Sequence, residues 1–415
     1  MAQLSNDCFA FGGELLSIDA ARALIAERLA PVAGTEVLPL VVADGRVLAE
    51  DVVAPHDLPP FANSAVDGYA VRFADLHPTG ETVLPVQGRL AAGASLAQQP
   101  ETGAVRIFTG APMPDGFDTV FMQEDVRVAD DAVVLPAGLK PGANRRLAGE
   151  DLRRGERALA AGKALGPQDI ALLAALGIAA VPVRRKLRVG VFSTGDEIVS
   201  PGEPLPPAAI YDSNRFMLQA LLRRLACEVT DLGILPDDRG TIARALSEAA
   251  ADHDLLMTSG GVSTGEEDHV KAAVEGAGGL SFWRLAIKPG RPVAMGVVGG
   301  TPFVGLPGNP VAVFVTFAHV ARTMIARLSG ETFAPPTPVE VRSAFAYRKK
   351  EGRREYVRVR LANGTGGVEA EKHPREGAGI LTSLTETDGL VELPEAVTRV
   401  EPGDKVGFLP YALLR

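Results

Sequence analysis

The chain contains little cysteine and no excess of positive charge, and each shortage excludes a class of protein. Among its 415 residues there are two cysteines, Cys8 and Cys227, too few for a disulfide framework or a structural zinc site. Such sparse cysteine is typical of a reducing compartment, so we expect a cytoplasmic protein. The net charge is −9, which argues against a large nucleic-acid surface, because neutralising phosphates requires clustered Lys and Arg.

We also expect no segment that would direct the chain to a membrane. Its N-terminus does not show the basic, apolar and small-residue order of a signal peptide. We expect no apolar run near the ~18 residues that a membrane-spanning helix needs. No group of His or Cys has metal-ligand spacing, and neither a P-loop nor a Rossmann fingerprint occurs in its proper context. With 46% hydrophobic residues, the sequence is typical of a soluble globular protein of about two to four domains.

Two helices are predicted in the N-terminal part of the chain. Ser17 is positioned to cap a helix over residues 17–30, whose apolar side chains recur on one face. A second helix is expected over 165–177, with Gly just past its end. Residues 36–53 predict an extended segment with a short helix near 45–50. We expect the two long helices to pack together in one discontinuous linking domain.

Two regions have the character of β structure. Between 55 and 143, Pro and Gly recur every few residues among short apolar runs, which predicts a small all-β domain inserted into the linking domain. Residues 332–415 show alternating polar and apolar positions, with Asn363 and Gly364 as a hairpin turn. This C-terminal region predicts a small β-barrel.

Between these β regions, strand and helix patterns alternate. Apolar runs at 187–192, 228–235 and 254–258 predict strands followed by helices, and two more strands flank Gly299-Gly300. Such alternation predicts an open, mostly parallel sheet with helices on both faces. The expected fold class is therefore a multidomain α/β protein with a linking domain, an inserted β domain, an α/β domain and a C-terminal β-barrel. Their expected bounds are 1–54 with 144–183, 55–143, 184–331 and 332–415.

Three Gly-rich loops follow predicted strands of the α/β domain, at 193–197, 259–268 and 306–310. Ligands of open α/β sheets bind at the carboxyl ends of strands, so these loops should lie at one edge. Glycines let backbone amides approach a ligand, and hydroxyls and helix N-termini donate to phosphate oxygens. Any one loop is better explained as a tight turn. Three at one edge favour a site for an anionic, phosphate-bearing ligand.

Carboxylates accompany these loops and indicate a magnesium site. They are Asp196, Glu197, Glu266, Glu267 and Asp268. Mg²⁺ is held by a few carboxylates together with phosphate oxygens and water. The alternative is helix capping, by Asp268 for the helix that follows it and by Asp237 or Asp238 for the helix near Thr241.

Basic residues are concentrated in two places. Lys288-Pro-Gly-Arg291 holds two cations in a turn with a restricted backbone, which suits a phosphate clamp, although a surface turn is the alternative. Residues 342–360 are rich in Lys and Arg, and there a solvated strand face is favoured over a binding surface.

The inserted β domain carries polar residues among Pro, Gly and aromatic residues. Asn63, Ser64 and Asp67 lie in one such stretch, and Thr109 begins a Thr-Gly-Ala-Pro segment. An isolated Asp-Gly pair predicts only a turn, so these motifs are weak when taken singly.

As an ordered set, the motifs resemble those of the molybdopterin molybdenumtransferases, a family that includes the C-terminal region of gephyrin. The match extends over about residues 17–330, and the C-terminal β region agrees in length and type. The matching motifs are Asn-Ser-Ala-Val-Asp-Gly-Tyr-Ala at 63–70, Thr-Gly-Ala-Pro at 109–112, Met-Gln-Glu at 122–124, Gly-Glu-Asp at 149–151, Phe-Ser-Thr-Gly-Asp-Glu at 192–197, Ser-Gly-Gly-Val-Ser at 259–263, Lys-Pro-Gly-Arg-Pro at 288–292 and Leu-Pro-Gly-Asn-Pro at 306–310.

The resemblance implies a reaction and an assembly. The family inserts molybdate into adenylyl-molybdopterin and releases AMP, and we expect Mg²⁺ as the cofactor. The subunit is expected to be elongated, with four domains, and to form a homodimer whose active site lies between the α/β domain of one subunit and the inserted domain of the other. A molybdopterin adenylyltransferase and molybdoenzymes are expected partners, and neither nucleic acid nor a membrane is.

Site residues follow from the resemblance together with the loops. The expected catalytic residues are Asp67, Thr109, Glu197, Asp237 and Asp268. The expected metal ligands are Asp196, Glu197 and Asp268. The expected substrate-binding residues are Ser193, Thr194, Gly195, Ser259, Gly260, Gly261, Ser263, Lys288, Arg291, Pro307, Asn309 and Pro310.

The sequence departs from the family pattern at a few positions. Many relatives carry Asp where Ala62 stands and Met where Val66 stands, and Lys is frequent at the position of Arg291. Leu147 and Ala148 stand where relatives often carry more Arg. These changes affect details around the expected site and leave the resemblance intact.

Two other functions fit part of the pattern. A non-catalytic scaffold that holds molybdopterin for a partner needs many of the same polar residues. A nucleotide pyrophosphatase resembling the competence-damage-inducible family shares the α/β domain type but lacks the 63–70 motif, so that motif discriminates against it.

Overall fold

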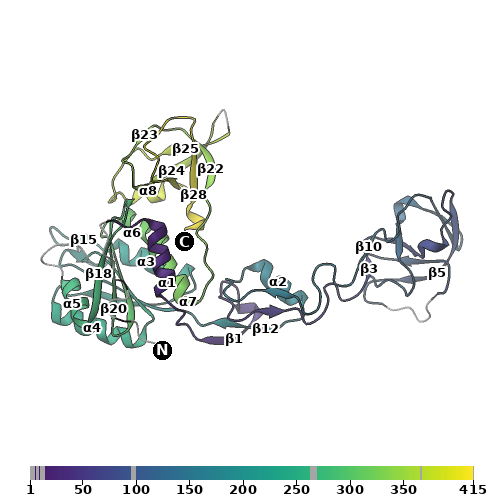
Figure 1. Cartoon of the computed structure of the whole chain (residues 1–415), viewed down its shortest axis with the longest axis horizontal. Helices are drawn as coiled ribbons and strands as arrows, with labels where there is room; N and C mark the ends of the chain where they lie inside the picture. The colour runs from purple at the N-terminus through teal and green to yellow at the C-terminus, as the bar shows by residue number, and fades with distance from the viewer. Residues whose placement is uncertain are drawn as a thin grey trace. The chain divides into compact units, whose positions relative to one another are not determined.

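The chain divides into two units, each with its own sheets and apolar core. In the computed structural model the described residues are Ser5, Phe9 and 15–94, 100–261, 269–364 and 367–414. The first unit comprises Met1–Ala49, Gly162–Leu165 and Pro182–Arg415, and the second comprises Glu50–Ala161 and Gly166–Val181. Figure 1 labels the helices and strands of both.

The second unit is built on a six-stranded sheet of order β7-β4-β6-β5-β9-β8. Val105, Ile107 and Val120 are fully buried in its core. The sheet strands are β4 (Gly68–Val71), β5 (Thr82–Leu90), β6 (Ala104–Ile107), β7 (Thr119–Met122), β8 (Arg127–Ala129) and β9 (Ala132–Leu135). Shorter elements are β2 (Val52–Val53), β3 (Asn63–Ser64), η2 (Phe73–Asp75), η3 (Gln123–Asp125), β10 (Arg145–Arg146) and β11 (Arg157–Leu159). The prediction of a small inserted β domain is confirmed.

Both predicted N-terminal helices form, but they do not share a domain. α1 (Ile18–Arg28) is capped by Ser17, whose side chain accepts from the Ala20 N–H at 3.1 Å. α2 (Pro167–Ala175) belongs to the second unit. The predicted packing of these helices against each other is wrong, because the apolar face of α1 is buried in the core of the α/β domain.

The α/β domain of the first unit has a six-stranded sheet of order β16-β13-β17-β21-β20-β18. The first four strands in this order are parallel, and β20 and β18 run antiparallel to their neighbours. The strands are β13 (Arg188–Thr194), β16 (Glu228–Leu235), β17 (Leu255–Ser259), β18 (Gly278–Arg284), β20 (Pro292–Val298) and β21 (Thr301–Leu306). The mostly parallel sheet is confirmed, and the edge strand β18 is an addition that the sequence analysis missed.

Helices cover both faces of this sheet, as predicted. α1 and α3 (Ser213–Arg224) contribute to one apolar core, and α4 (Arg239–Asp252) and α5 (His269–Ala277) contribute to the other. Figure 1 shows α4 and α5 together beside the sheet. Two short strands, β14 (Ile198–Val199) and β15 (Ile210–Tyr211), pair beyond the carboxyl end of β13.

A long helix follows Asn309 and continues from Pro310 to Ser329. It consists of α6 (Pro310–Thr316), a π-helical turn η4 (Phe317–Ala321) and α7 (Arg322–Ser329). Its mean hydropathy of 1.5 over 20 residues makes it long and apolar enough to span a membrane, so the expectation that no segment approaches this limit is wrong. In this structure the helix is part of the protein core, because 83% of its apolar stretch is buried inside the protein.

The C-terminal region closes into a five-stranded barrel. β24, β25, β22, β28 and β26 pair in that order, and β26 pairs back with β24. The strands are β22 (Val339–Ser343), β24 (Arg354–Gly364), β25 (Gly367–Lys372), β26 (Gly389–Leu393) and β28 (Lys405–Pro410). β23 (Tyr347–Arg348), α8 (Thr382–Thr385), β27 (Arg399–Val400) and η5 (Tyr411–Leu413) complete it. The predicted C-terminal barrel is confirmed. A short strand of the α/β domain, β19 (Ile287–Lys288), pairs with β24.

The predicted short helix near residues 45–50 is wrong. A 3₁₀ turn, η1 (Leu40–Val42), follows β1 (Thr35–Pro39), and the next residues are extended. The Leu48 N–H donates to the Lys163 carbonyl at 2.8 Å, and Leu48 bridges to Val183 at the end of β12 (Ala180–Arg184). Pairing with distant chain segments satisfies the backbone here, so a local helix does not form.

One buried ion cluster holds the starts of two central strands. The Asp254 side chain is 1% exposed and accepts from both Arg185 terminal nitrogens at 2.6 and 2.8 Å and from the Arg188 N–H at 2.8 Å. Burial opposes ionisation, but the hydrogen bonds from Arg185 and Arg188 outweigh it and hold the pKa of Asp254 below its ordinary value. Asp254 is therefore ionised in the folded protein at neutral pH.

We expect Asp254→Ala to lower the free energy of unfolding by roughly 1–3 kcal/mol, because it removes the buried acceptor of the Arg188 N–H and of two partly exposed guanidinium groups. The folded-state pKa is depressed, so the carboxylate stabilises fully above its unfolded pKa of about 3.9 and ceases to stabilise as pH falls through the folded value. Urea unfolding of parent and variant between pH 3 and 7 measures both effects. Asp252→Ala, at an exposed position on α4, is the matched control. Equal stability of parent and Asp254→Ala at pH 7 would contradict this account.

Candidate functional site

The parallel register of β13, β17 and β21 brings the three Gly-rich loops to one edge of the sheet. Phe192 lies beside Thr258, and Ser259 lies beside Leu306, so the strands end at the same level. The loops border a cavity of about 510 Å³. The predicted site residues that line it are Ser193, Thr194, Glu197, Ser259, Gly260, Gly261, Asn309 and Pro310.

Two glycines shape these loops: Gly261 lets the loop after β17 approach the loop after β13, and Gly195 permits a tight turn within the latter. Gly261 has φ +61°, and a Cβ there would lie 2.5 Å from the Thr194 Oγ1. Gly195 has φ +132°, and a Cβ there would lie 2.5 Å from the Glu197 Oε2. Any larger residue would therefore collide and be strained at either position. The cavity keeps its shape because both positions lack side chains.

The turn before α6 is tied to α3. The Asn214 Nδ2 donates to the Gly308 carbonyl at 2.6 Å, a contact that the sequence analysis did not predict. Asn309 occupies the N-cap position of α6, but its side chain makes no capping hydrogen bond. The Asn309 amide thus remains available at the cavity wall.

The predicted carboxylates are only partly gathered. Asp196 and Glu197 are exposed in the loop after β13, and Asp237 is exposed just beyond β16 without lining the cavity. Asp238, not Asp237, caps α4, accepting from the Thr241 N–H at 2.7 Å. Ser263, Glu266, Glu267 and Asp268 lie outside the described residues.

A complete metal site is not visible in the part of the chain that the structure describes. There, no group of three or more His, Cys, Asp or Glu is placed to hold a metal ion. Asp196 and Glu197 nevertheless follow Ser193 and Thr194 in the same loop, and Glu197 lines the loop cavity with both hydroxyl residues. This donor set fits Mg²⁺, which takes one or two carboxylates and completes its shell with substrate phosphate oxygens and water.

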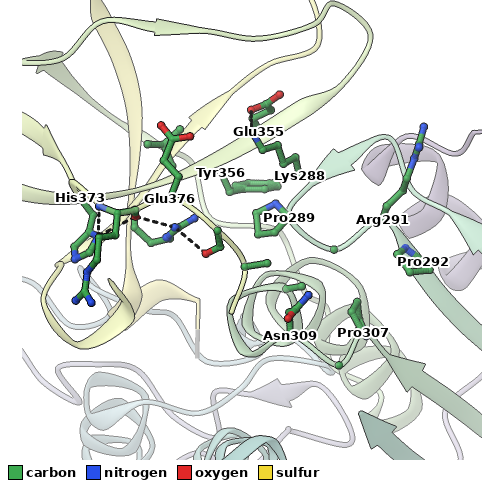
Figure 2. Close-up of a pocket in the computed structure, with 18 of the residues that line it drawn as sticks. Lys288, Pro289, Arg291, Pro292, Pro307, Asn309, Glu355, Tyr356, His373 and Glu376 are labelled. Atoms are coloured by element: carbon green, nitrogen blue, oxygen red, sulfur yellow. Dashed lines mark hydrogen bonds and ion pairs between the residues drawn. The ribbon is translucent and has the colours of Figure 1, made fainter. Parts of the chain in front are cut away.

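A second cavity, of about 520 Å³, lies between the α/β domain and the barrel (Figure 2). It adjoins the first, since both are lined by Gly260, Gly261, Gly308 and Asn309. The predicted residues Lys288, Arg291 and Pro307 line it. The barrel adds Arg358, Lys372, His373 and Arg375, against two acidic residues, Glu355 and Glu376. In a chain of net charge −9, cations therefore outnumber carboxylates around this cavity, although Lys288 and Lys372 are already ion-paired with Glu355 and Glu376.

The prediction that residues 342–360 form a solvated face holds only in part, because Arg342, Arg348, Lys350 and Arg360 are exposed whereas Arg354 and Arg358 are not. The Arg354 side chain is 13% exposed and paired with acidic residues, and the Arg358 Nε donates to the Ser383 Oγ at 3.0 Å beside the cavity. Tyr356 lies between them on the same face of β24, is buried, and stacks on His319 of η4 at 4.2 Å between ring centroids. The sequence feature that could have indicated this packing is Tyr356, a large aromatic residue between the charged residues of the strand.

Asp67 and Thr109 meet in the second unit. The Thr109 N–H and Oγ1 both donate to the Asp67 Oδ1 at 2.8 Å. These hydrogen bonds hold the pKa of Asp67 below its ordinary value, and Arg106 adds a smaller effect in the same direction. The inserted domain therefore presents an ionised carboxylate with a fixed orientation.

We expect Thr109→Val to raise the pKa of Asp67 toward the ordinary value, because one of the two hydrogen bonds to the charged form is lost. Carbon-13 NMR titration of the Asp67 carboxyl measures this. Thr82→Val removes a hydroxyl that accepts from the His77 N–H in the same domain and is the control. A pKa that rises equally in both variants would show that the Thr109 hydroxyl has no specific effect.

Three family models together match most of the chain. The "MoeA N-terminal region (domain I and II)" matches residues 16–177. The "Probable molybdopterin binding domain" matches residues 190–327, and the "MoeA C-terminal region (domain IV)" matches residues 340–411. The matches follow the order of the motifs and include both cavities.

Individual relatives match over nearly the whole length. A molybdopterin molybdenumtransferase of Haemophilus influenzae is 40% identical over 96% of this chain and 99% of its own. Molybdopterin molybdenumtransferase 2 of Mycobacterium tuberculosis is 37% identical over 89% of this chain and 93% of its own. The crystal structure of a molybdopterin biosynthesis moeA protein from Pyrococcus horikoshii has a TM-score of 0.81 at 32% identity, covering 96% of this chain and 100% of the other.

Proposed function

This chain belongs to the molybdopterin molybdenumtransferase family, and we propose that it inserts molybdate into adenylyl-molybdopterin with release of AMP. It is accordingly a transferase of molybdenum cofactor biosynthesis. The observation that carries the detailed proposal is the pair of adjoining cavities, one bordered by Gly-rich loops and the other by cations. Two anionic substrates that react with each other require two anion-binding sites that adjoin.

We assign the two substrates to the two cavities by their chemistry. The phosphates of adenylyl-molybdopterin suit the loop cavity, where the Ser193, Thr194 and Ser259 hydroxyls and Gly-rich backbone amides can donate to them. Molybdate is a compact dianion without a flexible tail, and it suits the cationic cavity. Lys288, Arg291 and Arg358 approach that cavity from the α/β domain and the barrel. Gly260, Gly261 and Asn309 line both cavities and would lie between the substrates.

We further propose that Asp196, Glu197 and Asp268 hold Mg²⁺, and Asp237 lies near the same edge as a further carboxylate. When bound, the ion would neutralise the phosphoanhydride and assist attack on it. The chain's own contribution is to orient the phosphates on the 193–197 and 259–263 loops and to hold molybdate beside them.

The assembly and setting are also proposals. Asp67 and Thr109 of the inserted domain would complete the cleft of a second subunit in a homodimer. Exposed apolar side chains supply surface for association, among them Val37, Val41 and Val42 at β1 and η1. We propose a cytoplasmic protein of four domains, with bounds as predicted from the sequence, that receives its substrate from a molybdopterin adenylyltransferase and serves molybdoenzymes.

The rival functions are weaker. A match to the N-terminal region over residues 16–177 includes the 63–70 motif, which the pyrophosphatase type lacks. A scaffold would bind both anions without releasing AMP, so the same assay separates it from a transferase.

We expect Asp67→Asn and Glu197→Gln each to lower molybdate-dependent AMP release by about 10²–10³-fold, the size of losing one group that stabilises a transition state. Purified protein, adenylyl-molybdopterin, Mg²⁺ and molybdate are mixed, and AMP is followed by chromatography. Glu203→Gln, in the exposed segment after the Glu197 loop, is the control. Release at the parent rate by both site variants would refute the assignment.

Mixing the two inactive variants tests the shared site. In a mixed dimer, the subunit with Asp67→Asn still has an intact Glu197, and the subunit with Glu197→Gln still has an intact Asp67. The site formed by these two intact residues is complete, and the other site carries both substitutions. Random reassociation should then restore about a quarter of the parent rate, since about half of the dimers are mixed. Sedimentation velocity confirms the dimer. No recovery after subunit exchange would mean that each site lies within one subunit.

A further inference from the structure

The cationic turn at residues 288–291 is held by the C-terminal barrel as well as by its own domain. β19 runs parallel to β24, with Ile287 beside Arg354 and Lys288 beside Glu355. The Arg354 N–H donates to the Ala286 carbonyl at 2.9 Å. The first residue of the turn is therefore fixed in register with a barrel strand.

Glu355 is a buried carboxylate on the apolar side of that strand. Along β24, Glu355 has the same parity as Val357 and Val359, which belong to the barrel core, and it is 1% exposed. A carboxylate in such a place destabilises the fold unless it is paired and hydrogen-bonded. Three donors surround it: the Arg353 Nε at 3.0 Å, the Tyr347 hydroxyl at 2.8 Å and the Lys288 Nζ at 3.5 Å.

Two of these donors belong to the cationic cavity. Lys288, Tyr347 and Glu355 all line it, and Figure 2 shows Lys288 and Glu355 side by side. The Lys288 Nζ also donates to the Tyr347 hydroxyl at 3.2 Å and lies 5.8 Å from the centre of its ring. Burial, with the Glu355 carboxylate as acceptor, raises the pKa of Tyr347, so the phenol stays protonated and can link both partners.

This arrangement holds Lys288 on one side and leaves N–H groups for a ligand. An ammonium group has three N–H donors; one donates to the Tyr347 hydroxyl, and the ammonium is also ion-paired with Glu355. Half of the Lys288 side chain remains exposed at the cavity. A free lysine would lose rotamer freedom on binding an anion, whereas this one is already ordered.

We propose that Glu355 is a positioning residue for the transferase reaction. It acts through Tyr347 and Lys288 to aim the Lys288 ammonium into the cationic cavity, where it binds the oxyanion substrate. The barrel is thereby a functional part of the site. This inference rests on the proposed function of the cavity.

Glu355→Gln keeps the size of the side chain and removes its charge. We expect it to raise the molybdate concentration for half-maximal AMP release roughly fivefold or more, while the rate at saturating molybdate stays within about twofold. Calorimetric titration of the purified protein with sodium molybdate alone should show the same weakening. Glu355→Asp, which keeps the charge, should recover most of the parent affinity.

The control is Glu371→Gln, which breaks the exposed ion pair with Arg360 elsewhere on the barrel and should behave as the parent. Thermal unfolding checks that each variant folds. Should Glu355→Gln not fold, Tyr347→Phe replaces it, because it cuts the same link and should shift the molybdate dependence in the same direction.

A double-mutant cycle separates positioning from general support of the fold. In a Lys288→Met background, Glu355→Gln should have no further effect on molybdate affinity, because the group that it positions is gone. Additive effects would overturn the inference, as would an unchanged molybdate dependence in Glu355→Gln. Failure of the parent itself to release AMP would instead overturn the proposed function, so the two failures are distinguishable.

Discussion

The parallel register of β13, β17 and β21 is the constraint on which the candidate site depends. Because parallel strands carry their carboxyl ends to one edge, three loops far apart in the chain converge there without any contact among them being encoded locally. Gly261 then lets the loop after β17 pack closely against Thr194 of the loop after β13. This register therefore brings the hydroxyls and carboxylates of these loops to the same edge of the sheet.

The barrel extends this site, although it follows the α/β domain in sequence. Pairing of β19 with β24 aligns the turn that begins at Lys288 with a barrel strand, and Arg358 of the same strand lines the cationic cavity. Tyr356, on the same face of β24 as Arg358, is buried and stacks on His319 of the α/β domain. The two cavities adjoin because residues of the barrel and of the loop edge of the sheet line the second cavity together, so a shift of the barrel would change the shape of that cavity.

A charged side chain that is buried in this protein needs a partner of opposite charge. Asp254 meets Arg185 and Arg188 at the starts of the strands, and Glu355 meets Lys288 and Arg353 near the ends of others. Both carboxylates are almost fully buried, and the energetic demand of burying charge makes their geometry specific. The first cluster joins the starts of two strands of the sheet, whereas the second orders Lys288 at the wall of the cationic cavity.

Local pattern in the sequence determined much of the fold and half of the site. Alternation of strand and helix signals predicts the α/β domain, and the Gly-rich loops that follow its strands predict the residues of the first cavity, because both are properties of neighbouring residues. The family motifs indicated Asp67 and Thr109 as site residues, but their hydrogen bonds to each other are seen only in the structure. Only the tertiary structure decided the rest: that α1 joins the α/β core, that residues 45–50 extend along distant segments, and that Arg358 and Glu355 belong to the second cavity. Alternation assigns Arg358 to one face of its strand and Glu355 to the other, but what covers each face depends on segments tens of residues away, and no local preference encodes such contacts.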